Sequence, residues 1–127
     1  MTSSQRSNNL PEAFKHAFAG LWHVLRTQRN AWIHSLATAA VIVMAIWTRV
    51  DRRDWALLLF AIGLVWIAEL FNTALESTID LTKPDLHPLA RTGKDIAAAA
   101  VLIAAVIAVI IGILILGPPI WARLTQG

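Results

Sequence analysis

Long apolar segments alternate with short polar ones along the chain. Asp, Glu, Lys and Arg are absent from 30–48, and 96–116 is almost purely aliphatic. A helix needs about 20 such residues to cross a bilayer, so each segment is long enough to span one. The apolar segment 55–68 is shorter, but helix-compatible sequence continues through Leu75. The pattern predicts an all-α membrane protein with three transmembrane helices, at about 31–48, 55–79 and 94–116.

The segment before the first span has an amphipathic pattern. Its basic side chains fall largely outside the positions where apolar side chains recur at helical spacing. These apolar side chains are Phe14, Phe18, Leu21 and Leu25. This pattern is typical of a helix that lies on a membrane surface, and we expect one over 11–28. A cytosolic helix packed against other protein is the alternative. The preceding residues, 1–10, are polar, and we expect them to be disordered.

Two connections separate the predicted spans. The first, TRVDRRD, is short, so the first two spans should be antiparallel neighbours. The second, 81–93, contains two prolines and a glycine, which should break any helix there. Gly117-Pro118 should end the third span. The membrane domain would then cover 11–119, with 120–127 as a short tail.

Composition and charge support a membrane location. Hydrophobic residues make up 57% of the 127 residues, which is above the usual share in soluble domains. Cys is absent, which excludes a disulfide framework, a thiolate nucleophile and a Cys-ligated metal site. The net charge is +3, and because the basic residues lie beside apolar segments they favour a membrane surface over nucleic acid. Most of the 11 Lys and Arg lie before the first span or near 81–93, so we expect both regions to be cytoplasmic.

One face of the second span is polar. On an ideal helix, Glu69, Asn72, Glu76 and Asp80 fall within an arc of about 80°. Ionised groups are costly in hydrocarbon, so this polar stripe should face a bundle interior or a wet cavity. Its oxygen atoms suit a divalent cation, and one of the acids could instead act as a general base. The alternatives are a structural polar seam between subunits and a proton-coupled carrier that uses Glu69.

Further charged residues follow the stripe. Lys94 and Asp95 open the third span, after a connection that contains Asp85 and His87. The start of a helix offers backbone N–H donors and a favourable dipole to an anion. An acidic stripe near a Lys-Asp pair at a helix start therefore favours a site for phosphates and a metal. A carrier would not need that pair.

The other His and Trp residues give weaker signals. The four His residues lack the spacing of a zinc site, and we expect His34, inside the first span, to make a helix–helix hydrogen bond. Trp66 lies deep in the second span, where we expect it to pack. The remaining Trp residues with an interfacial position are typical of an aromatic belt: Trp22, Trp32, Trp47, Trp55 and Trp121.

Four consecutive motifs carry a family resemblance. They are Glu69-x-x-Asn72-Thr73-Ala74-x-Glu76, Asp80-Leu81, Pro84-x-x-His87-x-Leu89-Ala90 and Lys94-Asp95-Ile96-Ala97-Ala98. Together they closely resemble the prokaryotic diacylglycerol kinase family, which includes the undecaprenol kinases of Gram-positive bacteria. The resemblance runs from about Phe14 to Leu116. It implies an integral lipid kinase of the bacterial plasma membrane that uses ATP and Mg²⁺. It also implies a homotrimer whose active sites are shared between subunits and face the cytoplasm.

The resemblance also implies roles for individual residues. Glu69 matches the catalytic acid–base residue of the family, and Glu76 matches a carboxylate that holds the magnesium bound to ATP. Asn72 matches the polar residue between them. Five further positions match nucleotide or phosphate contacts: Asp85, Leu86, His87, Lys94 and Asp95.

One position departs from the family pattern, and the acceptor lipid stays open. Family members commonly carry a Glu before the first span as a second metal ligand, and the register of Gln28-Arg29-Asn30 places Gln28 there. An amide oxygen binds hard magnesium less well than a carboxylate does. Diacylglycerol and undecaprenol both present a primary hydroxyl below an apolar body. The sequence of the second connection and around Gln28 resembles the undecaprenol kinases more than the diacylglycerol kinases.

Overall fold

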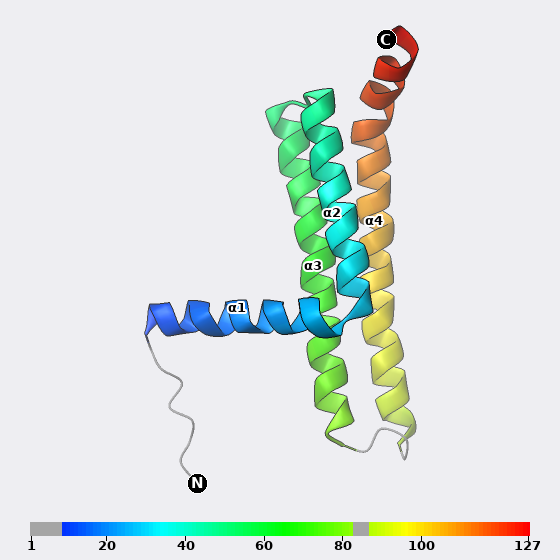
Figure 1. Ribbon diagram of the computed structural model, residues 1–127. Coiled ribbons are helices and arrows are strands. Elements are labelled where there is room, and N and C mark those ends of the chain that lie inside the picture. The colour runs from blue at the N-terminus through cyan, green and yellow to red at the C-terminus, as the bar shows by residue number, and fades with distance from the viewer. Residues whose placement is uncertain (1–8, 83–86) are drawn as a thin grey trace.

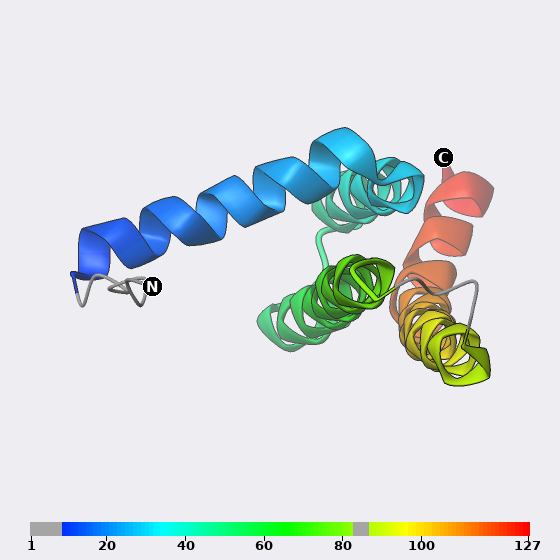
Figure 2. The same cartoon turned by 90° about the horizontal axis from the view of Figure 1, so that it is seen from below.

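The computed structural model describes residues 9–82 and 87–127, and the regular structure within them is entirely helical. It comprises four helices, α1 (Leu10–Thr27), α2 (Arg29–Thr48), α3 (Arg52–Asp80) and α4 (Pro88–Gln126). Figure 1 shows α2, α3 and α4 running alongside one another, with α1 extending sideways from the bundle. Seen along the bundle in Figure 2, the three long helices form a triangle, and α1 leaves it from the end of α2. The predicted fold class is confirmed.

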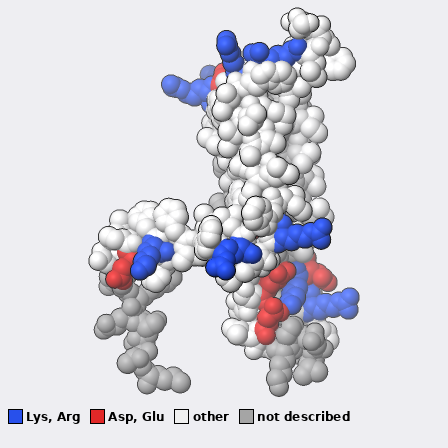
Figure 3. Space-filling view, viewed as in Figure 1, with Lys and Arg blue, Asp and Glu red and all other residues white. Residues whose placement is uncertain are grey.

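The three long helices have the character of membrane spans. Each is long and apolar enough to cross a bilayer. Large apolar side chains on their outer faces are exposed in the isolated chain, among them Leu36, Phe60 and Leu114. Figure 3 shows charged side chains at the two ends of the bundle and a band without them in between. Lipid or protein must cover this apolar band, since an exposed surface of this kind marks a contact with one or the other.

Helix α1 presents an apolar stripe of its own. Leu10, Phe14, Phe18 and Trp22 follow one another at four-residue intervals and are exposed. Near its end, α1 contacts α2 and α3, and Val24 is buried. A stripe of this kind on a helix that extends sideways from the spans (Figure 1) fits the predicted surface helix.

The turn into α3 follows from local chemistry. Arg49 ends α2 in a left-handed conformation, with φ 54°. Asp51 then caps α3, because its side chain accepts a hydrogen bond from the Asp54 N–H at 2.9 Å. The short turn makes α2 and α3 antiparallel neighbours, as the sequence predicts (Figure 1).

The second connection does separate α3 from α4, but α4 extends beyond the predicted third span at both ends. Helix α4 begins at Pro88, includes Gly93 and continues through Pro118 and Pro119 to Gln126. Proline fits the first turn because the N–H that it lacks has no partner there anyway. Proline is also tolerated inside membrane helices, where neighbouring groups satisfy the freed backbone atoms. The apolar stretch therefore stays helical beyond the predicted end at Gly117-Pro118.

Gly93 has a packing role instead of breaking the helix. A Cβ atom at this position would lie 3.2 Å from the Cδ1 atom of Ile79 on α3, which is closer than most such contacts. The absence of a side chain therefore lets the start of α4 approach the end of α3. The predicted disorder of 1–10 falls mostly on residues 1–8, outside the described residues, and α1 already includes Leu10.

Candidate functional site

Glu69 lies inside the helix bundle. Its side chain points from α3 toward α2, and the residue has 0% of its surface exposed. The nearest ionisable side chain is His34 on α2, whose Nε2 atom lies 3.5 Å from Glu69 Oε2. This separation is longer than the usual N–H···O hydrogen bond. Within the described part of the chain, both Glu69 oxygens and His34 Nε2 are buried and lack a hydrogen-bond partner.

Two more polar side chains extend this cluster along α3. Asn72 and Thr73 are 7% and 4% exposed, and Asn72 Oδ1 and Thr73 Oγ1 have no hydrogen-bond partner among the described residues. Together with His34 and Glu69 they form what we call the buried polar cluster. Native proteins leave few buried polar atoms unpaired, and functional sites are one place where they do so.

The polar stripe becomes more exposed toward the end of α3. Glu76 is half-buried, and Asp80 is exposed and accepts a hydrogen bond from Lys94 Nζ at 2.6 Å. This ion pair joins the end of α3 to the start of α4. Asp95 follows Lys94 and is exposed. Figure 1 shows α3 and α4 continuing past the level of α1, and Figure 3 shows acidic and basic side chains gathered on this extension.

The predicted metal ligands do not form a closed site within one chain. Gln28 lies in the bend between α1 and α2 and is half-buried, and its Nε2 atom is 3.5 Å from Thr27 Oγ1. Among the described residues, no group of three or more His, Asp or Glu side chains could hold a metal ion. Glu76 and Gln28 could each offer one oxygen atom, which suits a metal whose other ligands come from water and substrate.

The predicted nucleotide contacts are only partly covered by the structure. Asp85 and Leu86 lie outside the described residues. His87 caps α4, because its Nδ1 atom accepts a hydrogen bond from the Leu89 N–H at 3.1 Å. Lys94 lies in the second turn of the same helix. The described contacts therefore lie at the end of the bundle toward which the polar stripe becomes exposed.

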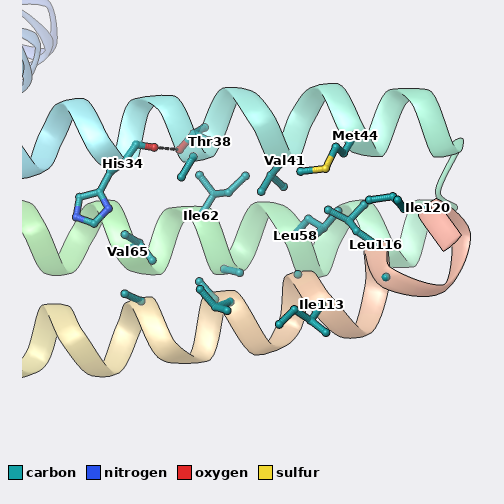
Figure 4. Close-up of a pocket in the computed structure, with 17 residues that line it drawn as sticks. His34, Thr38, Val41, Met44, Leu58, Ile62, Val65, Ile113, Leu116 and Ile120 are labelled. Carbon is teal, nitrogen blue, oxygen red and sulfur yellow. Dashed lines mark hydrogen bonds between the residues drawn. The ribbon is translucent and has the colours of Figure 1, made fainter. Parts of the chain in front are cut away.

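Sequence reasoning missed the position of His34 beside Glu69. We expected a helix–helix hydrogen bond for His34, but its Nε2 atom has no partner among the residues that the structure describes, although its ring does face α3 (Figure 4). Trp66, expected only to pack, also donates from Nε1 to Thr38 Oγ1 at 3.0 Å across the α2–α3 interface. The rings of His34 and Trp66 meet edge to face, with centroids 6.2 Å apart. One signal was available, since an ionisable residue inside a span is a functional candidate by default.

A cavity of about 400 Å³ lies between the three spans. Figure 4 shows His34 at one end of it with its ring directed toward α3, and Leu116 and Ile120 at the other. Apart from His34 and Thr38, its lining consists of aliphatic side chains, Met44, alanines and glycines. Such a lining suits a hydrocarbon chain. One end of an apolar cavity therefore adjoins the buried polar cluster.

Comparison with known proteins gives consistent matches. The family model described as "Prokaryotic diacylglycerol kinase" matches residues 15–116. An undecaprenol kinase of Bacillus subtilis (strain 168) is 40% identical over 121 residues, covering 93% of this chain and 98% of the relative. A diacylglycerol kinase of Synechocystis sp. is 44% identical over 117 residues, covering 91% of this chain and 67% of the relative. A diacylglycerol kinase of Escherichia coli (strain K12) is 37% identical over 89 residues, covering 65% of this chain and 73% of the relative.

Proposed function

Because the chain belongs to the prokaryotic diacylglycerol kinase family and is therefore a membrane lipid kinase, we propose that Glu69 is its general base. The proposal rests on the position of the Glu69 carboxylate inside the bundle, close to an apolar cavity. Glu69 is fully buried among spanning helices, and its neighbour His34 lines the end of an apolar cavity. A base at this depth can meet the hydroxyl of a lipid without leaving the bundle. The alternative of a proton-coupled carrier is set aside, since the family is one of kinases.

The chemistry that we propose is direct phosphoryl transfer. The oxygen of the lipid hydroxyl forms a bond to the γ-phosphorus of ATP, and the bond between that phosphorus and the leaving ADP oxygen breaks. Glu69 takes the hydroxyl proton and later gives it to water. Catalysis of this kind depends chiefly on positioning and on stabilising negative charge. Lys94, whose Nζ atom already pairs with an acid at the exposed end of the stripe, would offset the phosphate charge.

We propose that Glu76 and Gln28 hold magnesium. Mg²⁺ usually keeps several waters and binds one or two carboxylates together with substrate phosphates. A half-buried carboxylate at Glu76 fits this donor set, and the amide oxygen of Gln28 is the weaker of the two candidates. When bound, the ion would neutralise part of the phosphate charge.

The nucleotide would bind at the exposed end of the stripe. The residues that we propose to contact it are Asp85, Leu86, His87, Lys94 and Asp95, together with Asn72, which lies deeper along α3 in the buried polar cluster. Support comes from the charges that gather on the extension of α3 and α4 (Figure 3) and from the N-terminal end of α4, which favours anions. Because ATP is cytoplasmic, this end and α1 would face the cytoplasm of a bacterial cell.

We further propose a homotrimer with active sites shared between subunits. The broad apolar faces of α2, α3 and α4 leave room for a second copy of the chain within the bilayer. One chain also offers few ligands for a metal ion, since the described residues include no group of three or more His, Asp or Glu side chains that could hold one. A neighbouring subunit would complete the site.

Undecaprenol is the acceptor that we place first, ahead of diacylglycerol. The undecaprenol kinase of Bacillus subtilis matches over 98% of its length, and the cavity beside His34 is lined almost entirely by apolar groups. One assay tests the proposal, with purified protein, labelled ATP and magnesium and the two lipids offered separately. We expect label in undecaprenol at a higher rate than in diacylglycerol. The reverse order would overturn the acceptor alone, and label in neither lipid would contradict the proposed chemistry.

A further inference from the structure

We propose that His34 is a positioning residue for phosphoryl transfer, donating from Nε2–H to Oε2 of Glu69 and leaving Oε1 to meet the lipid hydroxyl. This inference rests on the proposed role of Glu69 as the base. It assigns a function to an imidazole that we expected to be structural.

The argument begins with the isolation of the two groups. The His34 and Glu69 side chains are 14% and 1% exposed, so water has little access to either. Their nearest polar atoms are 3.5 Å apart, and neither has another hydrogen-bond partner in the part of the chain that the structure describes. Burying an ionised group without a partner is costly. Each group is therefore the natural partner of the other, and a small shift would bring them into hydrogen-bond range.

The imidazole ring is itself held in place. Trp66 meets His34 edge to face, at a centroid distance of 6.2 Å and an interplanar angle of 65°. The indole is fixed in turn by its hydrogen bond to Thr38 Oγ1. Thr38 donates to the backbone oxygen of His34 at 2.7 Å, which closes the set of contacts. A supporting shell of this kind is what a precisely placed catalytic group requires.

A fixed carboxylate serves the reaction in two ways. A hydrogen bond from a donor to an ionised carboxylate is stronger than one between neutral groups, so it holds the Glu69 carboxylate firmly in one orientation. It also engages one oxygen and leaves the other for the acceptor. During transfer the hydroxyl proton moves to Oε1, and the proton on His34 Nε2 stays where it is. His34 therefore acts through Glu69 and takes no proton itself.

Steady-state kinetics in two backgrounds test this role. His34→Leu removes the donor at similar volume, and we expect kcat to fall about 10²-fold, the lower end of the range for acid–base catalysis. The KM values for ATP and lipid should change less than about threefold, because the lost hydrogen bond is made to Glu69 and not to either substrate. His34→Gln keeps an N–H near the position of Nε2 and should retain more activity than His34→Leu. In the Glu69→Gln background, His34→Leu should cause no further loss.

Ser35→Ala is the matched control. This neighbour of His34 donates to the Ala31 backbone oxygen of its own helix, at 2.8 Å, and the loss of its hydroxyl should leave kcat unchanged. If His34→Leu does not assemble, His34→Gln is compared with His34→Asn, whose shorter amide does not reach Glu69. Equal activity of these two variants would overturn the proposal.

The outcomes separate this inference from the proposed function. A His34→Leu enzyme with wild-type kcat, or with the same loss in both backgrounds, would show that His34 does not act through Glu69, while Glu69 stays the base. A Glu69→Gln enzyme with wild-type kcat would remove the base itself, and the role of His34 would fall with it.

Discussion

Replacing Glu69 by Gln should lower turnover without lowering the stability of the fold. The two side chains have nearly the same size, so the substitution creates no cavity in the bundle. The loss of a general base lowers turnover by about 10²–10⁴-fold. At 1.36 kcal/mol for each factor of ten, this corresponds to about 3–5 kcal/mol of transition-state stabilisation. The fold should not lose stability, because an amide costs less to bury than an ionised carboxylate.

Two measurements on the same purified protein check this prediction. Transfer of labelled phosphate to the lipid gives kcat, and thermal unfolding in the same detergent gives the midpoint temperature. We expect kcat to fall by the stated factor and the midpoint to stay equal or rise. Asp54→Asn, the same chemical change near the start of α3, serves as the control and should leave kcat unchanged. Turnover of Glu69→Gln within a few-fold of wild type would refute the role of Glu69, and a large drop in the midpoint would show that the carboxylate is structural.

Three further substitutions address the metal site and the supporting contacts. Glu76→Ala should raise the magnesium concentration needed for half-maximal activity and weaken MgATP binding, and an unchanged metal titration would place Glu76 in a structural seam. Gln28→Glu should lower that concentration with little change in the KM for lipid, because a carboxylate is the better ligand for a hard cation, whereas an unchanged titration would remove Gln28 from the site. Trp66→Phe loses the hydrogen bond to Thr38 and should lower the free energy of unfolding by about 0.6 kcal/mol, the mean for such bonds between membrane helices. Because the phenyl ring still contacts His34, kcat should fall less than in His34→Leu, and an equal fall would show that the indole N–H matters to the reaction.

The sequence predicts the spans well because the length of an apolar segment is a direct physical requirement of the bilayer. The ends of the helices are less predictable. Pro118 and Pro119 suggest an end to a helix because proline lacks the N–H of the backbone ladder, yet α4 passes through both. The signals for proline and glycine derive chiefly from helices in water. In α4, Gly93 allows a close approach to Ile79, and Pro88 lies in the first turn. Neither residue therefore breaks the helix as the sequence predicts.

The polar stripe is also readable from the sequence, since helical spacing alone puts Glu69 and Glu76 on one face. Which residue lies opposite Glu69 is not readable in the same way. Helix α2 is apolar on most sides, so its pattern does not indicate which face meets α3. His34 takes its place beside Glu69 only through the packing of the two helices. The four family motifs begin on α3 and end on α4, and the resemblance implies no role for a residue of α2.

The depth of the stripe supports the division of roles that we propose for its two Glu residues. At a rise of 1.5 Å per residue, Glu76 lies about 10 Å further along α3 than Glu69. Glu69 has no exposed surface, whereas Glu76 is half-buried near the end that extends past α1. Because Mg²⁺ gives up its waters reluctantly, it suits the wetter carboxylate. A base that takes a proton from a lipid instead needs to be within reach of the apolar cavity, and His34 connects Glu69 to that cavity. Exchanging the two roles would put a hydrated cation in the driest part of the bundle.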